Sequence, residues 1–411
     1  MADQALPHYV GLDIGTSKIR CIVGVVDPGS ADKVSIIGYG SAATDSMRKG
    51  VVVYADAVTE SIIAAVNEAE RISGLHIDAA TVNVNGAHVA GINSKGVVAI
   101  SAANRQINED DRLRVEDAAT IVQLPPNREI VQLFAKNYRL DGQGNIKDPI
   151  GMQGVRLEVD THIVTAATPS LRNLDLAIDK SQIAINRRTL SSLAAVEAVL
   201  TKQQKEAGTL VLDIGAGTTN LAVIEDGEVQ HVAVIAMGSI NITNDLAIGL
   251  KTDLDIAEQA KIQYASLEEK QTKENVTVEF EKANHNFKAS EIKMITEARV
   301  EEIFDYVEKE LRKIQRSQKL PGGIVLVGGC AKLPGIAEFA KEKLSLAARI
   351  GQLQNITGLV ESVNDPADFT AVGLMLLDML LIPNQATHKT GNIANTKILN
   401  SLNKLLNFRG Q

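Results

Sequence analysis

Apolar and polar positions repeat regularly near the start of the chain. Apolar residues form three short runs, at residues 8–14, 19–26 and 34–39, and glycine or polar residues separate them. Runs of this length and composition are typical of β-strands. Residues 56–73 then carry apolar side chains at helical spacing. The pattern predicts a unit of three strands followed by a helix.

The same pattern returns in the second half of the chain. Three apolar runs, at residues 210–214, 219–224 and 228–236, alternate with Gly-Ala-Gly and Asp-Gly turn signals, and a helical pattern follows. The repetition predicts an α/β architecture that is internally duplicated.

Three other segments differ from these units in composition and in the pattern of apolar residues. Residues 84–165 contain short apolar runs, the acidic stretch 108–117 and a glycine-rich loop at 141–151, so we expect an inserted subdomain with short strands. Residues 253–319 carry Glu and Lys at helical spacing, which predicts solvated helix faces. Residues 383–396 are polar and contain Pro and Gly, which predicts a flexible linker.

Composition narrows the function classes. The 411-residue chain is 45% hydrophobic with a formal net charge of -8, which predicts a soluble protein of two or more domains. We expect no membrane span and no export signal, and hence a cytoplasmic location. Cys21 and Cys330 lie in apolar runs, so a disulfide is not expected. The acidic balance and 3% aromatic content argue against a nucleic-acid partner.

Two related turns carry the candidate chemistry, LDIGTSK at residues 12–18 and LDIGAGTTN at residues 212–220. Each puts an Asp at the end of an apolar strand, followed by glycine and hydroxyl residues. Glycine lets the backbone approach a phosphate, and successive N–H groups bind anions. Asp13 and Asp213 would supply the carboxylates that Mg2+ prefers, in part through water. One such turn is compatible with an ordinary hairpin, but two in a duplicated unit predict a nucleotide site.

A third glycine turn follows an apolar run farther along the chain. The segment IVLVGGC ends at Gly328 and Gly329, and a helix is predicted to begin near Pro334. A turn without side chains admits a flat base. Glu258 and Lys261 fall three residues apart on one helix face and are candidates for binding a ribose. An ordinary ion pair explains the same spacing equally well.

These motifs resemble the phosphate-1, phosphate-2 and adenosine motifs of the actin, Hsp70 and sugar-kinase superfamily. The resemblance implies a ribonuclease H-like, duplicated two-lobe fold that holds ATP and Mg2+ between its lobes. No P-loop motif and no strand-following G-x-G-x-x-G motif is present. The residues implied to contact the nucleotide are Asp13, Gly15, Thr16, Ser17, Lys18, Asp213, Gly215, Gly217, Thr218, Glu258, Lys261, Gly328 and Gly329.

Within this superfamily the chain resembles the FtsA family of bacterial cell-division proteins. The stretch at residues 146–165 is similar to the end of that family's extra subdomain, called 1C. The resemblance implies a membrane-associated adaptor that polymerises, binds the C-terminal tail of FtsZ and works with other divisome proteins at the septum. Arg299 matches a family position that contacts the FtsZ tail, although an exposed helical Arg often has no specific partner.

The resemblance also implies a division of the chain into subdomains. The expected segments are 1–83 and 166–205 for subdomain 1A, 84–165 for 1C, 206–245 and 321–382 for 2A, 246–320 for 2B, 383–396 for the linker and 397–411 for a membrane-targeting helix.

The C-terminal segment supports the membrane prediction independently. On a helical projection its apolar residues share one side, Asn400, Asn403, Lys404 and Asn407 lie opposite, and all four charges after Pro383 are basic. Shallow burial of six apolar side chains contributes roughly 5 to 9 kcal/mol before the cost of ordering the helix. This predicts a weak, reversible anchor on anionic lipid; docking on the protein's own core is the alternative. The residues expected to contact the membrane are Ile398, Leu399, Leu402, Lys404, Leu405, Leu406, Phe408 and Arg409.

Catalysis is the weakest part of the resemblance. Actin-like ATPases commonly place a Glu or Gln after the interdomain helix to orient water, but Ser191 occupies that place and Glu197 is off register. We therefore expect a weak ATPase at most. A small-molecule kinase of the same fold and a pilus-assembly relative remain alternatives, and the basic tail disfavours the second.

Overall fold

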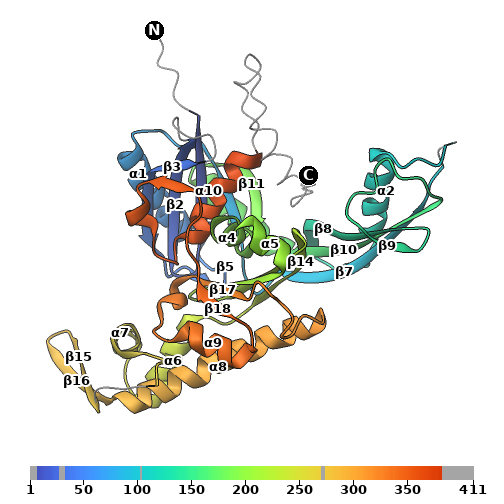
Figure 1. Ribbon diagram of the computed structural model, residues 1–411. Helices are drawn as coiled ribbons and strands as arrows, with labels where there is room; N and C mark the ends of the chain where they lie inside the picture. Colours follow the sequence, from blue (N-terminus) through green and yellow to red (C-terminus); the bar gives the residue numbers. More distant parts are fainter. Residues whose placement is uncertain (1–6, 27–32, 102–103, 270–273, 382–411) are drawn as a thin grey trace, which may run out of the picture.

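The computed structural model describes residues 7–26, 33–101, 104–269 and 274–381. Figure 1 shows two α/β lobes, the first above the second, with a third sheet extending to one side. The linker and membrane helix predicted from residues 383–396 and 397–411 lie outside the described residues. Within the described part of the chain, no helix is both long and apolar enough to cross a membrane.

The first lobe is built on a six-stranded sheet with the order β11-β6-β1-β2-β3-β19. Strands β1, β2 and β3 are antiparallel, whereas β6, β11 and β19 join the sheet in parallel. The chain therefore begins with the predicted three-strand unit. The strands span β1 His8–Ile14, β2 Lys18–Val26, β3 Val34–Ala43, β6 Ala79–Val84, β11 Ala184–Leu190 and β19 Ile356–Gly358.

Helices cover both faces of this sheet. Helix α1, Ala55–Ser73, lies along β3, and α10, Phe369–Leu381, packs on β1 and on α4, Ser191–Val199. A methyl group on Gly11 would lie 2.2 Å from the carbonyl oxygen of Ala371, so only glycine lets α10 approach β1 this closely. The start of α10 is thereby brought to the end of β1. Helix α3, Thr168–Lys180, and the short strands β4, Met47–Arg48, and β5, Val51–Val52, complete this lobe.

The second lobe repeats this plan in a five-stranded sheet with the order β14-β13-β12-β17-β18. Strands β14, β13, β12, β17 and β18 correspond in turn to β3, β2, β1, β6 and β11 of the first sheet, and only β19 has no counterpart among the described strands. This match confirms the predicted duplication. Its strands span β12 Thr209–Ile214, β13 Thr219–Glu225, β14 Glu228–Ile235, β17 Ile324–Val327 and β18 Ala348–Ile350. Its helices are α5 Lys202–Ala207, α6 Ser239–Leu250, α7 Leu254–Tyr264, α8 Ala289–Lys313, α9 Ile336–Leu344 and the short 3-10 helix η1 Gly329–Lys332. The short 3-10 helix η2 Val360–Val363 follows β19 and packs on β3 of the first lobe.

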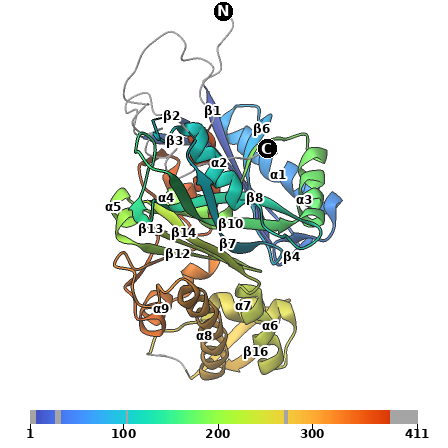
Figure 2. The same ribbon diagram turned by 90° about the vertical axis from the view of Figure 1, so that its right-hand side faces the viewer.

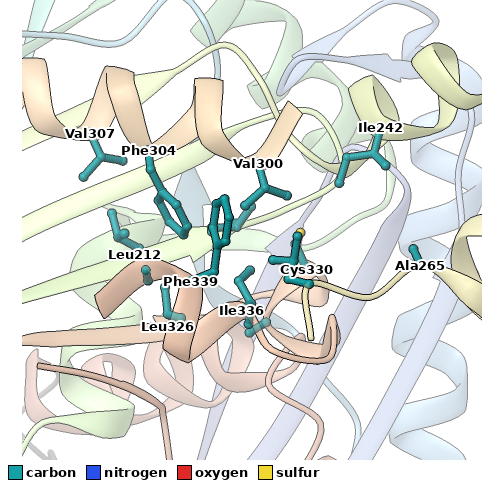
Figure 3. Close-up of a cluster of buried hydrophobic side chains, with 14 of the residues drawn as sticks. Leu212, Ile242, Ala265, Val300, Phe304, Val307, Leu326, Cys330, Ile336 and Phe339 are labelled. Carbon is teal, nitrogen blue, oxygen red and sulfur yellow. The ribbon is translucent and has the colours of Figure 1, made fainter. Parts of the chain in front are cut away.

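The core of the second lobe lies between this sheet and α8. Figure 3 shows Phe304 of α8 beside Phe339 of α9, and their ring centroids are 6.1 Å apart. Leu212 of β12 and Leu326 of β17 are fully buried in the same cluster. Cys330 packs there as a free, buried thiol, in agreement with the expectation that it forms no disulfide. This apolar layer fixes the second Asp turn, which follows β12 directly.

The inserted subdomain is a four-stranded sheet with the order β7-β10-β8-β9, covered by helix α2. Burial holds the pKa of His162 at about 3, so its neutral Nε2 accepts a 3.1 Å bond from Val232 N of β14. This bond joins the subdomain to the second lobe, as the closeness of β10 and β14 in Figure 2 illustrates. The elements span β7 Ala90–Ala99, α2 Glu109–Ala119, β8 Arg128–Leu140, β9 Gln143–Ile146 and β10 Arg156–Ala167.

Two local predictions are wrong. The inserted strands are not short, since β8 has 13 residues and β10 has 12, because each pairs along its length with a long neighbour. The segment 253–319 is not helical throughout, because β15, Asn275–Phe280, and β16, Ala283–Lys288, form a hairpin before α8. The helix predicted to begin near Pro334 is α9, which begins at Ile336 directly after Gly335 in a left-handed conformation.

Candidate functional site

The two Asp turns line one pocket between the lobes. Each turn joins the first two strands of its unit, and the two hairpins share one register, with Asp13 paired with Arg20 and Asp213 with Asn220. The third glycine turn, at Gly328 and Gly329, forms another part of the wall and is called the adenosine turn below after the motif that it resembles. The pocket is lined by Asp13, Gly15, Thr16, Ser17, Lys18, Arg20, Asn85, Asp213, Gly215, Ala216, Thr218, Asn220, Ser239, Gly328, Gly329, Ala367 and Thr370.

Asp13 occupies a buried, polar corner of this pocket. Its Oδ1 accepts a 2.7 Å hydrogen bond from Asn83 Nδ2, and Asn83 Oδ1 accepts a 2.7 Å bond from Ile14 N. Burial raises the pKa of Asp13 to about 7, the Arg20 charge opposes this rise, and Asp213 adds to it. The carboxylate is thus costly to keep charged unless a cation joins it.

Asp213 has a different set of partners. Its Oδ2 accepts a 3.2 Å bond from Thr370 Oγ1 and a weak 3.5 Å bond from Asn220 Nδ2. Burial raises the pKa of Asp213, while the Thr370 hydroxyl, Arg20 and Asn220 counteract the rise. A hydroxyl and an amide therefore support this carboxylate, with the cation Arg20 on the opposite lobe.

Two glycines are required by close contacts. A methyl group on Gly328, whose φ is 85°, would lie 2.5 Å from Asp213 Oδ1, so the adenosine turn rests on the second Asp turn. A methyl group on Gly217 would lie 2.9 Å from the Thr16 side chain. Gly217 is not among the pocket-lining residues; it lets the two Asp turns touch. Thr218 Oγ1 adds a 3.2 Å bond to Asn85 Oδ1 across the same junction.

Glu258 and Lys261 form an ion pair at 2.6 Å on α7. Thr243 Oγ1 donates a 2.5 Å hydrogen bond to Glu258 Oε2, and Lys261 Nζ lies 3.4 Å from the carbonyl oxygen of Ser239. Ser239 lines the pocket, whereas Glu258 and Lys261 do not. The pair stands directly behind the pocket wall, and its contact with a ribose stays a prediction.

Three other predicted residues lie away from the pocket lining. Arg299 of α8 is not the exposed helical Arg considered above, because its side chain is 21% exposed and its Nε donates a 2.5 Å bond to Asp245 of α6. Ser191 is buried at the start of α4 and lies 3.1 Å from Asn83 Nδ2. Glu197 pairs with Lys205 at 2.8 Å and is committed to that ion pair.

The sequence did not reveal several residues that shape the site. Arg20 and Asn220 lie directly across the hairpins from the two Asp residues, so counting strand register could have found them. Asp368 and Thr370 could not be found in this way. They come from the start of α10, more than 150 residues from either Asp turn, and only the fold brings them close.

The residues present fit a magnesium–nucleotide complex. Asp13 and Asp213 are buried carboxylates that a divalent cation would neutralise, and Thr16, Ser17 and Thr218 supply hydroxyl groups. No group of three or more His, Cys, Asp or Glu side chains among the described residues could hold a metal alone. The two buried Asp residues suit Mg2+, which is usually bound by one or two carboxylates together with phosphate oxygens and water.

Comparison with known proteins identifies relatives for both parts of the chain. A family model described as "Cell division protein FtsA" matches residues 210–373, and one described as "SHS2 domain inserted in FTSA" matches residues 86–165. Cell division protein FtsA of Pseudomonas aeruginosa is 35% identical over 378 residues, which cover 91% of this chain and 89% of the relative. Cell division protein FtsA of Bacillus subtilis is 38% identical over 371 residues, covering 89% and 82%.

Solved structures share the fold. The PilM-PilN type IV pilus biogenesis complex contains a chain similar at a TM-score of 0.65 and 17% identity, covering 91% of this chain and 99% of that one. MreB5 of Spiroplasma citri bound to ADP is similar at a TM-score of 0.54 and 13% identity, covering 91% and 97%. These likenesses confirm the predicted actin-like fold and show the fold alone.

Proposed function

The chain belongs to the FtsA family of cell division proteins, and on this premise we propose that it is an ATP-binding adaptor. The adaptor polymerises and tethers FtsZ filaments to the inner face of the cytoplasmic membrane at the division septum. Other divisome proteins are further partners. The observation that carries the proposal is the single pocket into which both Asp turns and the adenosine turn open.

Nucleotide binding is the first part of the proposal. Asp13 and Asp213 hold Mg2+, in part through water, and the turns around Gly15 and Gly215 receive the phosphates. Gly329 has no heavy atom within 4 Å of an added Cβ, which leaves room for an adenosine. Glu197 is held by Lys205 in an ion pair at 2.8 Å, which supports a role for ATP as an assembly ligand with weak hydrolysis at most.

Self-association is the second part. The inserted subdomain, assigned to residues 84–165, stands to one side of both lobes in Figure 1, which suits a contact with the next copy in a filament. The bond from Val232 N to His162 Nε2 connects it to the second lobe. Movement of that lobe would therefore reach the polymerising surface.

FtsZ binding is assigned to subdomain 2B, residues 246–320, with Arg299 as the candidate contact. Asp245 and Glu302 hold the guanidinium group in place. Replacing Arg299 with Met should weaken binding of an FtsZ C-terminal peptide about tenfold, as loss of a charge-assisted bond predicts. Arg312→Met is a matched control on the same helix, since its side chain is 71% exposed and pairs with Glu308.

Membrane attachment is assigned to residues 397–411, which lie outside the described residues. The full chain should co-sediment with anionic liposomes in Mg·ATP, and a chain ending at Pro383 should not. The double variant Leu402→Glu/Leu405→Glu should also lose binding. Asn403→Glu/Asn407→Glu adds the same charge to the opposite predicted face and should retain more liposome binding than the Leu402/Leu405 variant. Equal loss in both double variants would show that charge alone governs binding and would contradict an apolar anchor.

The single most informative experiment adds FtsZ to this assay. With the FtsZ C-terminal peptide present, the full chain should bring the peptide down with the liposomes, and electron microscopy should show filaments. A chain that binds neither peptide nor lipid would overturn the adaptor function. The pilus-assembly alternative is supported only by a fold-level likeness at 17% identity, and the relatives at 35–38% identity favour cell division.

A further inference from the structure

We propose that Arg20 recognises the terminal phosphate of the bound nucleoside triphosphate and thereby sets a preference for the triphosphate over the diphosphate. This inference rests on the proposed nucleotide-binding function and deepens it. It concerns a residue that the Asp-turn motifs do not include, because Arg20 lies on β2 beyond the turn itself.

The position of Arg20 follows from the hairpin register. Arg20 pairs with Asp13 across β1 and β2, so both side chains leave the sheet on the same face. Arg20 lines the pocket together with Thr16, Ser17 and Lys18, and its side chain is 17% exposed. A cation is therefore held at the phosphate end of the pocket and still reached by solvent.

A carboxylate orients the guanidinium group. Nε of Arg20 donates a 2.6 Å bond to Asp368 Oδ1 at the start of α10, and Nη1 lies 4.0 Å from Asp13 Oδ2. The bond through Nε restrains the plane of the group, with Nη1 on the side of Asp13. Paired terminal nitrogens of an Arg are suited to a phosphate, which they can bind through two parallel hydrogen bonds.

The charges around the pocket require such a cation. Asp13, Asp213 and Asp368 bring three carboxylates to this region, and a nucleoside triphosphate carries more negative charge than a diphosphate. Lys332 is engaged by Asp365 at 2.7 Å, and Lys18 lines the pocket from an exposed position at the strand end. Arg20 is the cation that the structure places beside Asp13 and holds through Asp368, so it is set to offset the charge of the added phosphate.

The internal duplication supplies a comparison for this position. In the second hairpin the equivalent residue is Asn220, which pairs with Asp213 and points into the same pocket. The turn geometry therefore does not require an Arg at this place, because an amide serves in an equally regular hairpin. The positive charge at residue 20 is an added feature of the first lobe: Asp368 orients it, and a terminal phosphate is the ligand charge that it would meet.

Calorimetric titration of the full-length protein with Mg·ATP and Mg·ADP tests the inference. Replacing Arg20 with Met, which keeps an unbranched apolar stem and removes the charge, should weaken ATP binding about tenfold or more and ADP binding less than about threefold. Arg20→Lys should bind ATP with an affinity between those of Arg20→Met and the wild type. Arg71→Met removes an exposed charge on α1 and should leave both affinities unchanged.

The outcomes separate the two levels of the proposal. Wild-type protein that binds neither nucleotide would end the proposed nucleotide-binding function and this inference together. Wild-type protein that binds ATP with the same affinity as Arg20→Met, or an equal loss for ATP and ADP, would overturn the role of Arg20 alone. Thermal unfolding checks that each variant is folded, and Arg20→Gln provides a second neutral substitution if the Met variant is unstable.

Discussion

The two Asp turns share one backbone plan but differ in what surrounds the carboxylate. Both begin with Leu-Asp-Ile-Gly and close hairpins of the same register. Asp13 is joined by an amide from Asn83 and lies beside the cation Arg20, whereas Asp213 receives the Thr370 hydroxyl. The shared residues build the turn. The residues across the hairpin and from α10 decide what each turn does, so duplication of a fold does not imply duplication of its chemistry.

The difference has an electrostatic consequence. Burial raises the pKa of Asp13 to about 7, where its protonation changes near neutral pH. The pKa of Asp213 is also raised by burial, and hydrogen bonds from Thr370 and Asn220 counteract that rise. A divalent cation would stabilise the charged form of both carboxylates. Substitutions at the two turns are expected to differ in their effect on the free energy of unfolding.

The largest effect is expected where the adenosine turn rests on the second Asp turn. Gly328→Ala should lower the free energy of unfolding by about 3 kcal/mol, because φ is 85° and the new methyl group meets Asp213 Oδ1. Gly329→Ala is the matched control, since nothing lies within 4 Å of its added Cβ, and should cost less than about 0.5 kcal/mol. Urea unfolding measures both, and equal losses would contradict the packing described here.

Asp13→Asn should stabilise the nucleotide-free protein at pH 8 by about 1–3 kcal/mol, since the buried charge is removed and Asn83 keeps an acceptor. The folded pKa lies above the unfolded value, so the folded state holds the proton more firmly. Wild-type stability from this group is present below about pH 4 and is lost as pH rises to about 7.

The advantage of Asp13→Asn should therefore grow between pH 4 and pH 8. Urea unfolding at several pH values provides the measurement, and Asp305→Asn on the exposed face of α8 serves as the control. An advantage that stays constant across this range would show that Asp13 is not held in a charge-disfavouring site.

A smaller effect is expected at the second turn. Thr370→Val removes the hydroxyl that bonds to Asp213 Oδ2 at 3.2 Å and should lower stability by about 1 kcal/mol. The loss should grow as pH rises through the raised pKa of Asp213, because the hydroxyl stabilises the charged carboxylate. Thermal unfolding over a series of pH values gives the comparison, and a pH-independent loss would assign the effect to packing.

The smallest stability effect should come from the ion pair behind the second turn. Glu258→Gln should change the free energy of unfolding by less than about 0.5 kcal/mol, because the Glu258 side chain is 41% exposed. If the pair holds the ribose, ATP affinity should fall several-fold, with Lys261→Met giving a similar loss. A stability loss above about 1 kcal/mol with unchanged affinity would favour the structural alternative.

The sequence was sufficient for the repeated β-units because strand periodicity and glycine turns are local signals. Ten of the predicted nucleotide residues line the pocket, since the motifs include the turn residues themselves. Asp368 and Thr370 were beyond reach because α10 arrives through long-range packing on Gly11. The long inserted strands were misjudged because their length comes from pairing with each other, and apolar runs alone do not record that pairing.

If both Asp turns form one nucleotide site, each carboxylate is needed for ATP to bind. Calorimetry can compare Mg·ATP binding to the wild-type chain, to Asp13→Asn and to Asp213→Asn. We expect one ATP per wild-type chain and at least about tenfold weaker binding in each folded variant, as loss of a metal-directed carboxylate implies. Unchanged affinity in either variant, or two ATP molecules per chain, would contradict it.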